Sequence, residues 1–369
     1  MAAVRRDIDE QARRLSETAA AAGLDRLLLA DPLSLSWLLG VRWSVRMGSD
    51  KPCFAVHLDA RSGGLPAVHV VTPRNEAARL VEVELAEVAY SGEMGVLTHE
   101  WNEGPWSVID TDGRLGSDMP AAGVRSIAED IARVRRALVA PQKLELAAVT
   151  ARVTRIVEAT ARRARVGMTE RALAAETVEA LVRDGLEPLV VLVGSGTDLD
   201  RFKHPLPRDV PIGGRFMVSV GARGAGVVTS VTRYGTFDGL TAREADEYRR
   251  LQEVEAVLLR SSTPGARLGA ALDAGKAAYR THGFPAETWR EHHQGGIAGF
   301  APREVIAGGT DDPVLQEDMV VAWNPSASGW KVEDVALVSA SGAHPLGQPG
   351  EGWPAHDVGG VTRPAVLEI

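Results

Sequence analysis

Residues 215–233 read RFMVSVGARGAGVVTSVTR. The two apolar runs, Arg215–Val220 and Val227–Thr232, predict two strands joined by the glycine-rich segment Gly221–Gly226. The glycines follow the order G-x-x-G-x-G and lie between two expected strands. A dinucleotide-binding loop needs a strand before its glycines and a helix after them, so we interpret the segment as a hairpin turn.

Helical patterns precede and follow this hairpin. One helix is expected to begin near Pro141, because proline suits a first helical turn, and a second is expected after the break at Gly167. Thr241-Ala242-Arg243-Glu244 is a capping box that opens a further helix. The last third, Glu291 to Ser339, has the pattern of strands and turns.

The first third of the chain alternates between helical and extended patterns, which predicts a small α/β layer domain. The expected elements are the helices Ile8–Ala22 and Arg74–Val83 and the strands Arg26–Ala30, Cys53–Leu58 and Ala67–Val71. With 369 residues and a prior of roughly 150 residues per domain, we expect two domains, residues 1–139 and 140–369.

Composition excludes several classes of protein. Hydrophobic residues at 45% and charged residues at 24% are typical of globular chains. The net charge of −8 and the absence of a basic block argue against nucleic-acid binding. Cys53 is the single cysteine, so no disulfide can form within the chain and a cysteine-rich zinc site is excluded. No apolar run has the length of a membrane span and no signal peptide is evident, so a cytoplasmic protein is expected.

Seven short motifs follow one another in the second domain. They are His204-Pro205, Ser219-Val220-Gly221, Ser230-Val231-Thr232-Arg233, His292-His293-Gln294-Gly295-Gly296, Arg303-Glu304, Asn324-Pro325 and Lys331-Val332-Glu333-Asp334. In order and spacing they resemble the creatinase/aminopeptidase P/prolidase (pita-bread) family. That family shows H-x-P, D-x-G, D-x-T-R about 11 residues on, then G-H-G, H-E, E-P and x-E-D. The resemblance covers roughly Leu144 to Leu346, and Asp31–Gly40 resembles a segment of the family's N-terminal domain.

The resemblance implies an α/β N-terminal domain followed by an α+β pita-bread C-terminal domain. The second domain would contain a curved antiparallel sheet backed by helices. The resemblance also implies a homodimer that acts on a small-molecule substrate.

The chain departs from the family at the metal positions. Metal-dependent members hold two divalent cations with two Asp, one His and two Glu. Carried over by position, the two Asp become Ser219 and Ser230, the His becomes Gly296, and the first Glu becomes Asn324. Glu333 alone remains of the four carboxylates. Hard divalent metals select carboxylates, so we expect no metal ligands and no cofactor.

Creatinase likewise has both metal Asp positions replaced, and its general base is the His that corresponds to His204. We therefore expect a metal-independent enzyme in which His204 is the acid–base group and Glu333 and His293 orient it or share its proton. The expected substrate-binding residues are Ser219, Ser230, Thr232, His292, Arg303 and Asn324. Creatinase has a second carboxylate where this chain has Thr232, which argues against creatine hydrolysis.

The expected substrate is a small amino-acid-like or C–N-bonded molecule, and hydrolysis, elimination and cyclisation all remain open. If His292 and His293 lie in a strand, only one faces the cavity, and we choose His293. Arg303 stays charged at neutral pH and suits carboxylate binding. One alternative is a catalytically inactive pita-bread module that binds a peptide or protein. Another is a Xaa-Pro aminopeptidase-type metallopeptidase with rearranged ligands.

Overall fold

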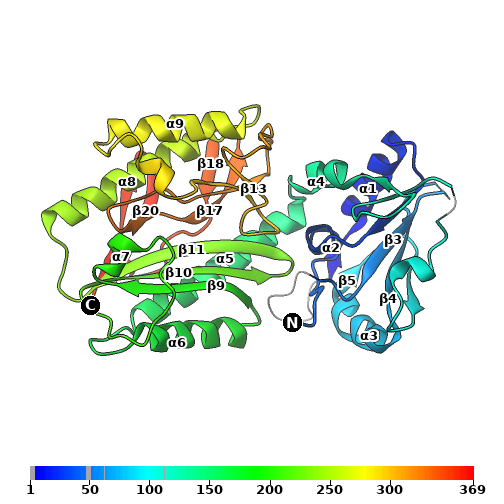
Figure 1. Ribbon diagram of the computed structural model, residues 1–369, viewed down its shortest axis with the longest axis horizontal. Helices are drawn as coiled ribbons and strands as arrows, with labels where there is room; N and C mark the ends of the chain where they lie inside the picture. Colours follow the sequence, from blue (N-terminus) through cyan, green and yellow to red (C-terminus); the bar gives the residue numbers. More distant parts are fainter. Residues whose placement is uncertain (1–4, 47–50, 62, 112) are drawn as a thin grey trace. The chain divides into compact units, whose positions relative to one another are not determined.

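The computed structural model describes residues 5–46, 51–61, 63–111 and 113–369 (Figure 1). The chain divides into two compact units. One consists of Met1–Gln142 with Ala225–Val227, and the other of Lys143–Gly224 with Val228–Ile369. The division after Gln142 lies close to the one expected after residue 139.

The first unit is built on a six-stranded sheet of mixed direction, in the order β6-β4-β3-β2-β7-β8. Its strands are β2 (Arg26–Leu29), β3 (Ala55–Asp59), β4 (Ala67–Pro73), β6 (Met94–His99), β7 (Leu115–Ser117) and β8 (Arg125–Ser126). Its helices are α1 (Asp9–Ala21), α2 (Pro32–Leu39), α3 (Arg74–Arg79) and α4 (Ala128–Arg135). Two short strands, β1 (Arg6–Asp7) and β5 (Val88–Ala89), pair separately. The expected α/β domain is therefore observed.

Two details of this unit differ from the sequence expectation. The strand expected from Cys53 begins at Ala55, and the helix expected to reach Val83 changes after Arg79 into a π-helical turn over Leu80–Glu84. Short 3-10 turns follow at Leu85–Glu87 and Pro105–Ser107. These are end effects, which local propensity predicts least well.

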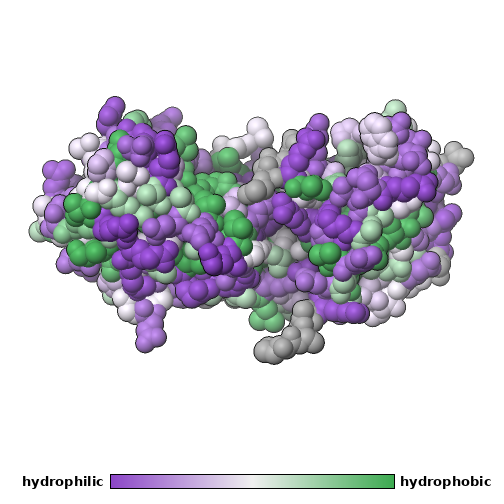
Figure 2. Space-filling model, turned by 90° about the horizontal axis from the view of Figure 1, so that it is seen from below, coloured by the Kyte–Doolittle hydropathy of each residue, from purple (hydrophilic) through white to green (hydrophobic). Residues whose placement is uncertain are grey.

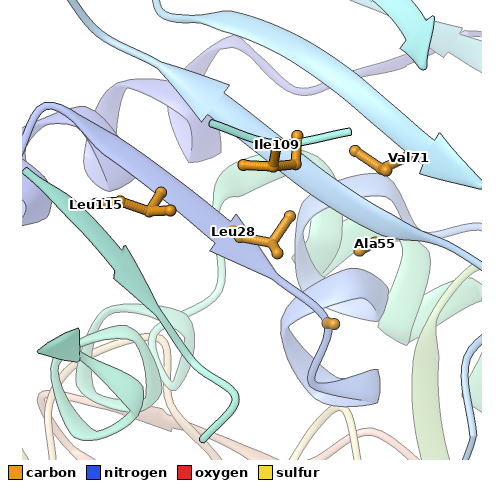
Figure 3. Packing of buried hydrophobic residues seen from close by; sticks show 6 residues of the cluster. Leu28, Ala55, Val71, Ile109 and Leu115 are labelled. Atoms are coloured by element: carbon orange, nitrogen blue, oxygen red, sulfur yellow. The ribbon is translucent and has the colours of Figure 1, made fainter. Parts of the chain in front are cut away.

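Apolar side chains from several strands form the core of the first unit. Figure 3 shows Leu28, Ala55, Val71, Ile109 and Leu115 packed over the sheet. Leu28 is 1% exposed and Val71 is fully buried. Burying such aliphatic side chains contributes roughly 1.5–3 kcal/mol each, so this cluster holds the strands together.

The second unit contains a nine-stranded, mainly antiparallel sheet whose main path is β13-β12-β14-β17-β11-β10-β9. These strands are β9 (Glu187–Ser195), β10 (Arg215–Gly224), β11 (Val227–Thr236), β12 (Gly295–Ala298), β13 (Val305–Ile306), β14 (Val320–Trp323) and β17 (Asp334–Ser339), joined by β18 (Gly342–Pro345) and β21 (Leu367–Glu368). Two small hairpins pair β15 (Ser326–Ala327) with β16 (Trp330–Lys331) and β19 (Ala355–Val358) with β20 (Val361–Pro364).

Helices cover this sheet on two sides. In Figure 1, α5 and α6 run along one side of β9–β11, and α8 and α9 pack together along the other side of the unit. The helices are α5 (Ala140–Ala161), α6 (Glu170–Arg183), α7 (Asp198–Arg201), α8 (Ala242–Ser261) and α9 (Leu268–Thr281), with a 3-10 turn, η4 (Thr288–Glu291). The expected pita-bread fold class is confirmed.

Several local predictions are confirmed in the second unit. Pro141 lies in the first turn of α5, and Thr241 and Glu244 form the expected capping box of α8. The glycine-rich turn is shorter than expected, because β10 continues to Gly224. Ala225 and Gly226, at φ of 51° and 79°, form the bend alone, as in a two-residue hairpin turn.

The face of the molecule drawn in Figure 2 has the mixed, mostly hydrophilic character expected from a globular composition. On the face shown in Figure 2, hydrophilic side chains cover much of each unit, with hydrophobic side chains scattered between them. None of the helices in the described part of the chain combines the length and apolar character that a membrane crossing requires.

Buried ion pairs connect the sheet of the second unit to α5, α8 and β20. Asp334 accepts from Arg233 Nη1 at 3.0 Å and from Arg363 Nη2 at 2.9 Å. Arg233 also pairs with Glu158 at 3.1 Å, and Arg363 with Glu255 at 2.7 Å. Each of these side chains is at most 2% exposed. Arg233 is therefore a structural residue that joins the sheet to α5.

We predict that Arg363→Met destabilises the second unit strongly, because it leaves the buried Glu255 carboxylate without its cation. Breaking one side of a buried pair typically costs about 3–5 kcal/mol. The control is Arg243→Ala, which removes an exposed i,i+4 pair with Glu247 on α8 and should cost about 0.3–0.5 kcal/mol. Urea unfolding measures both variants, and equal losses would contradict this account of the network.

Candidate active site

Residues from eight segments of the second unit surround a cavity of about 130 Å³. Its lining consists of Val190, Leu192, His204, Ser219, Val220, Gly221, Ser230, His293, Pro302, Arg303, Asn324, Lys331 and Glu333. Seven of the nine residues singled out from the sequence are among them. β9 supplies the apolar wall and β10 and β11 supply the two serines. His204 follows α7, His293 precedes β12, Pro302 and Arg303 lie between β12 and β13, Asn324 follows β14, and Lys331 ends β16 shortly before Glu333.

The other two expected site residues, Thr232 and His292, lie behind the lining. The Thr232 hydroxyl is 2.8 Å from the Ser219 hydroxyl, and the two form a buried hydrogen bond. His292 Nε2 is 3.0 Å from His204 Nε2. Each of these two residues therefore contacts a residue of the cavity lining.

Glu333 is held between two cations. Lys331 Nζ lies 2.6 Å from one carboxylate oxygen, and Arg303 Nη2 lies 2.7 Å from the other. The three side chains are 8–9% exposed. Burial alone would raise the pKa of Glu333, but the ammonium and the guanidinium lower it to about 2. Glu333 is therefore a permanent anion at neutral pH and has no proton to share.

This result corrects the expected partnership between His204 and Glu333. Among the described residues, the hydrogen-bond partners of Glu333 are Lys331, Arg303 and, at 3.4 Å, Thr232. The partner of His204 is His292. The proton-sharing role given to Glu333 therefore has no geometric support.

Lys331 is the residue that sequence reasoning missed. Its ammonium also approaches the Ser219 hydroxyl, at 3.4 Å, and thus lies between the last family carboxylate and the first replaced aspartate position. Lys331 and Glu333 are two residues apart in extended chain, and side chains at that spacing share a face. This spacing could have placed Lys331 in the cavity before the structure was known.

The residues at the family's metal positions do not fit two divalent cations. Ser219, Ser230 and Asn324 offer neutral oxygens, and the single carboxylate, Glu333, is already neutralised by Lys331 and Arg303. A metal beside Glu333 would have to displace or face an ammonium 2.6 Å from its ligand. The donor set and the local charge therefore both oppose the two-metal arrangement.

Three imidazoles meet at the edge of the cavity. The rings of His292 and His293 have centroids 4.3 Å apart, and those of His204 and His292 are 4.8 Å apart. The assumption that His292 and His293 alternate in a strand is wrong, because they lie between η4 and β12. His293 lines the cavity, whereas His292 supports His204 from outside the lining.

Partial burial lowers the pKa of each imidazole. The pKa of His292 falls to about 3 through desolvation and the neighbouring His293, and that of His293 falls to about 4 through desolvation and Arg303. Desolvation and then Lys331 lower the pKa of His204 below the ordinary histidine value. All three rings are therefore neutral at physiological pH.

Two buried polar atoms of the lining have no hydrogen-bond partner among the described residues. They are Asn324 Oδ1, on a side chain that is 2% exposed, and Arg303 Nε. Unpaired buried polar groups carry a desolvation penalty, which a ligand that completes them removes. Asn324 and Arg303 thus each carry a buried polar atom that a further hydrogen-bond partner would stabilise.

Comparisons with known proteins agree with this fold. Residues 145–347 match the model of metallopeptidase family M24. No curated protein matches the chain significantly. A dipeptidase PepE from Mycobacterium ulcerans is similar in structure, with a TM-score of 0.72 and 23% identity over 99% of this chain and 100% of that chain.

Two further solved structures are similar over nearly the whole chain. The prolidase from Pyrococcus horikoshii has a TM-score of 0.73 and 15% identity over 93% of this chain and 99% of its own. The N-terminal domain of the FACT complex subunit SPT16 from Cicer arietinum has a TM-score of 0.65 and 14% identity over 93% and 98%. The expected relationship is confirmed: the chain belongs to metallopeptidase family M24 and has the pita-bread fold.

Proposed function

We propose that this chain is a metal-independent pita-bread enzyme that acts on a small amino-acid-like or C–N-bonded substrate. In this proposal His204 is the acid–base group, and His292 and His293 assist it. Hydrolysis, elimination and cyclisation at a C–N bond all require such a group. The homodimer expected from the family resemblance is part of the same proposal.

The observation that carries the proposal is the position of Lys331 and Arg303. Both cations contact Glu333 at the place where relatives of this fold would use a carboxylate for metal. With Glu333 counted, the lining carries a net charge of +1 at neutral pH. A pocket of this charge attracts a carboxylate or stabilises negative charge that develops on a reacting oxygen. Side chains would then supply the charge that metal supplies elsewhere.

The histidine pair favours acid–base chemistry. If the Asn324 amide turns its oxygen toward His292 Nδ1, that nitrogen can donate a proton and His292 Nε2 becomes an acceptor. His204 Nε2–H then donates to His292 across 3.0 Å, which leaves the Nδ1 lone pair of His204 free to accept a proton. The buried amide would thereby fix the tautomer of the base.

The second candidate function is a catalytically inactive module that binds a peptide or protein. It is favoured by the loss of the family's carboxylates and by the structural likeness to a subunit of the FACT complex. A titratable pair within hydrogen-bond distance at the cavity favours the enzyme instead. A Xaa-Pro aminopeptidase-type metallopeptidase with rearranged ligands is the least supported, because Lys331 neutralises the remaining carboxylate.

We predict that the protein does not take up stoichiometric Mn²⁺, a cation that prefers oxygen ligands. The site offers one carboxylate, that of Glu333, which already forms salt bridges with Lys331 and Arg303. Protein incubated with Mn²⁺ and then desalted should contain no stoichiometric manganese by elemental analysis. Two bound equivalents that disappear in Glu333→Gln would overturn the metal-independent proposal.

We predict that His204→Ala lowers turnover by about 10²–10⁴-fold, the usual contribution of an acid–base group. The double variant His204→Ala, His292→Ala should be little worse than the single one, because paired groups act as a unit. His344→Ala, which alters an exposed histidine bonded to Ser339 and Ser341, is the control.

The substrate for this assay can be sought among small molecules that raise the melting temperature of the native protein. If a true substrate is turned over equally well by wild type and His204→Ala, the acid–base assignment is wrong. If small molecules fail to bind while a protein partner binds, the inactive module is the correct function.

We predict that Glu333 stabilises the fold above its unfolded-state pKa of about 4.5 and loses this effect as pH falls toward its folded pKa of about 2. Wild type should therefore melt well above Glu333→Gln at pH 7. The difference should shrink between pH 4.5 and pH 2, because wild-type Glu333 then becomes neutral as well. A difference that is independent of pH would contradict the ionised state.

A further inference from the structure

The three imidazoles at the cavity edge come from two separate segments of the second unit. His204 follows α7, and His292 and His293 link η4 to β12. One ring nitrogen from each residue lies within 4.8 Å of the other two, and Nε2 of His204 and Nε2 of His292 are 3.0 Å apart. Ring nitrogens of three neutral imidazoles therefore gather in one region of space.

This spacing is close to what a single transition metal needs. With Zn–N bonds of about 2.0–2.1 Å and tetrahedral angles, ligand nitrogens lie about 3.3 Å apart. The Nε2 atoms of His204 and His292 are slightly nearer than that value. His204 and His293 are exposed, so their rings can rotate to close the widest gap without disturbing a packed core.

We propose that His204, His292 and His293 form a binding site for one imidazole-preferring transition-metal ion, of which Zn²⁺ is the representative. This site is separate from the two-metal position of the family. Its ligands are three neutral nitrogens, and it uses neither Glu333 nor the residues that replaced the aspartates. The expectation that the chain has no metal ligands considered only the inherited positions, so this proposal departs from it.

The surrounding charge determines which cations the site accepts. Lys331 and Arg303, offset by the single charge of Glu333, disfavour metals that bind mainly through charge, such as Mg²⁺ and Mn²⁺. Imidazole nitrogen suits Zn²⁺ and Cu²⁺, whose affinity for nitrogen ligands exceeds that of Mn²⁺. Selectivity for Zn²⁺ over Mn²⁺ is therefore a property of this donor set.

Asn324 contacts His292, one of the proposed ligands. Its Nδ2 lies 3.5 Å from His292 Nδ1, and Oδ1 of the same amide is buried and unpaired. With that oxygen turned toward Nδ1–H, His292 would present Nε2 to the metal. Metal-bound histidines commonly donate their other N–H in this way, which fixes the ring. His204 and His293 line the cavity, so the remaining coordination position would open into it.

Zn²⁺ at this site would occupy a lone pair of His204. If His204 is the acid–base group, which rests on the proposed function, the metal is an inhibitor of the enzyme. Binding itself does not depend on that function. Zn²⁺ binding and the acid–base role of His204 can therefore be disproved independently of each other.

The test is isothermal titration calorimetry of the untagged chain with Zn²⁺. Wild type should bind one equivalent, and His204→Ala and His292→Ala should each bind at least about tenfold more weakly, the lower end of the effect of perturbing a metal site. His344→Ala, an exposed histidine remote from the cluster in sequence, should bind like wild type.

A second variant separates this site from the family's metal position. Lys331→Met combined with Glu333→Gln removes the carboxylate but keeps the net charge of the lining at +1. It should retain one equivalent of Zn²⁺. The proposal is overturned by no Zn²⁺ binding in wild type, by unchanged binding in His204→Ala, or by loss of binding in this double variant if that variant melts cooperatively.

Discussion

The chemistry of this molecule depends on one carboxylate held by two cations. Glu333 contacts Lys331 at 2.6 Å and Arg303 at 2.7 Å in a site that is more than nine-tenths buried. A buried carboxylate needs positive charge close to it, and here Lys331 and Arg303 provide that charge. Because the carboxylate is neutralised twice, it is a poor metal ligand, and the neutral Ser219, Ser230 and Asn324 beside it do not change that. The fold is that of metallopeptidase family M24, but in this cavity two cationic side chains, Lys331 and Arg303, surround the single carboxylate.

The cations also contribute to the state of the histidines. Burial, together with the nearby positive charge of Lys331, keeps the imidazoles neutral, so they can accept protons or bind a transition metal but do not add further positive charge. His204 and His292 form one pair, and Asn324 contacts its outer end. The neutral His204 ring has a single nitrogen lone pair, so acid–base work and Zn²⁺ binding would each exclude the other.

Spacing in the sequence was enough to predict the fold and most of the site. The apolar runs on either side of Gly221–Gly226 indicated two paired strands, and the capping box at Thr241 indicated the start of α8. Lys331 was missed although its two-residue spacing from Glu333 was a usable signal, whereas its contact with Ser219 joins residues 112 apart and has no local signature. The role of Glu333 was misjudged for the same reason, since Arg303 reaches it from a distant loop. The rings of His292 and His293 meet because that segment is not a strand, and a two-residue alternation does not apply outside strands.

The most direct test of the central claim is a crystal structure of protein grown with Mn²⁺, examined for anomalous scattering. The account predicts no manganese peak beside Glu333, with the Lys331 ammonium in salt-bridge distance of that carboxylate. A manganese peak between Ser219, Ser230 and Glu333, with Lys331 turned away, would show that the metal site persists and would contradict the account.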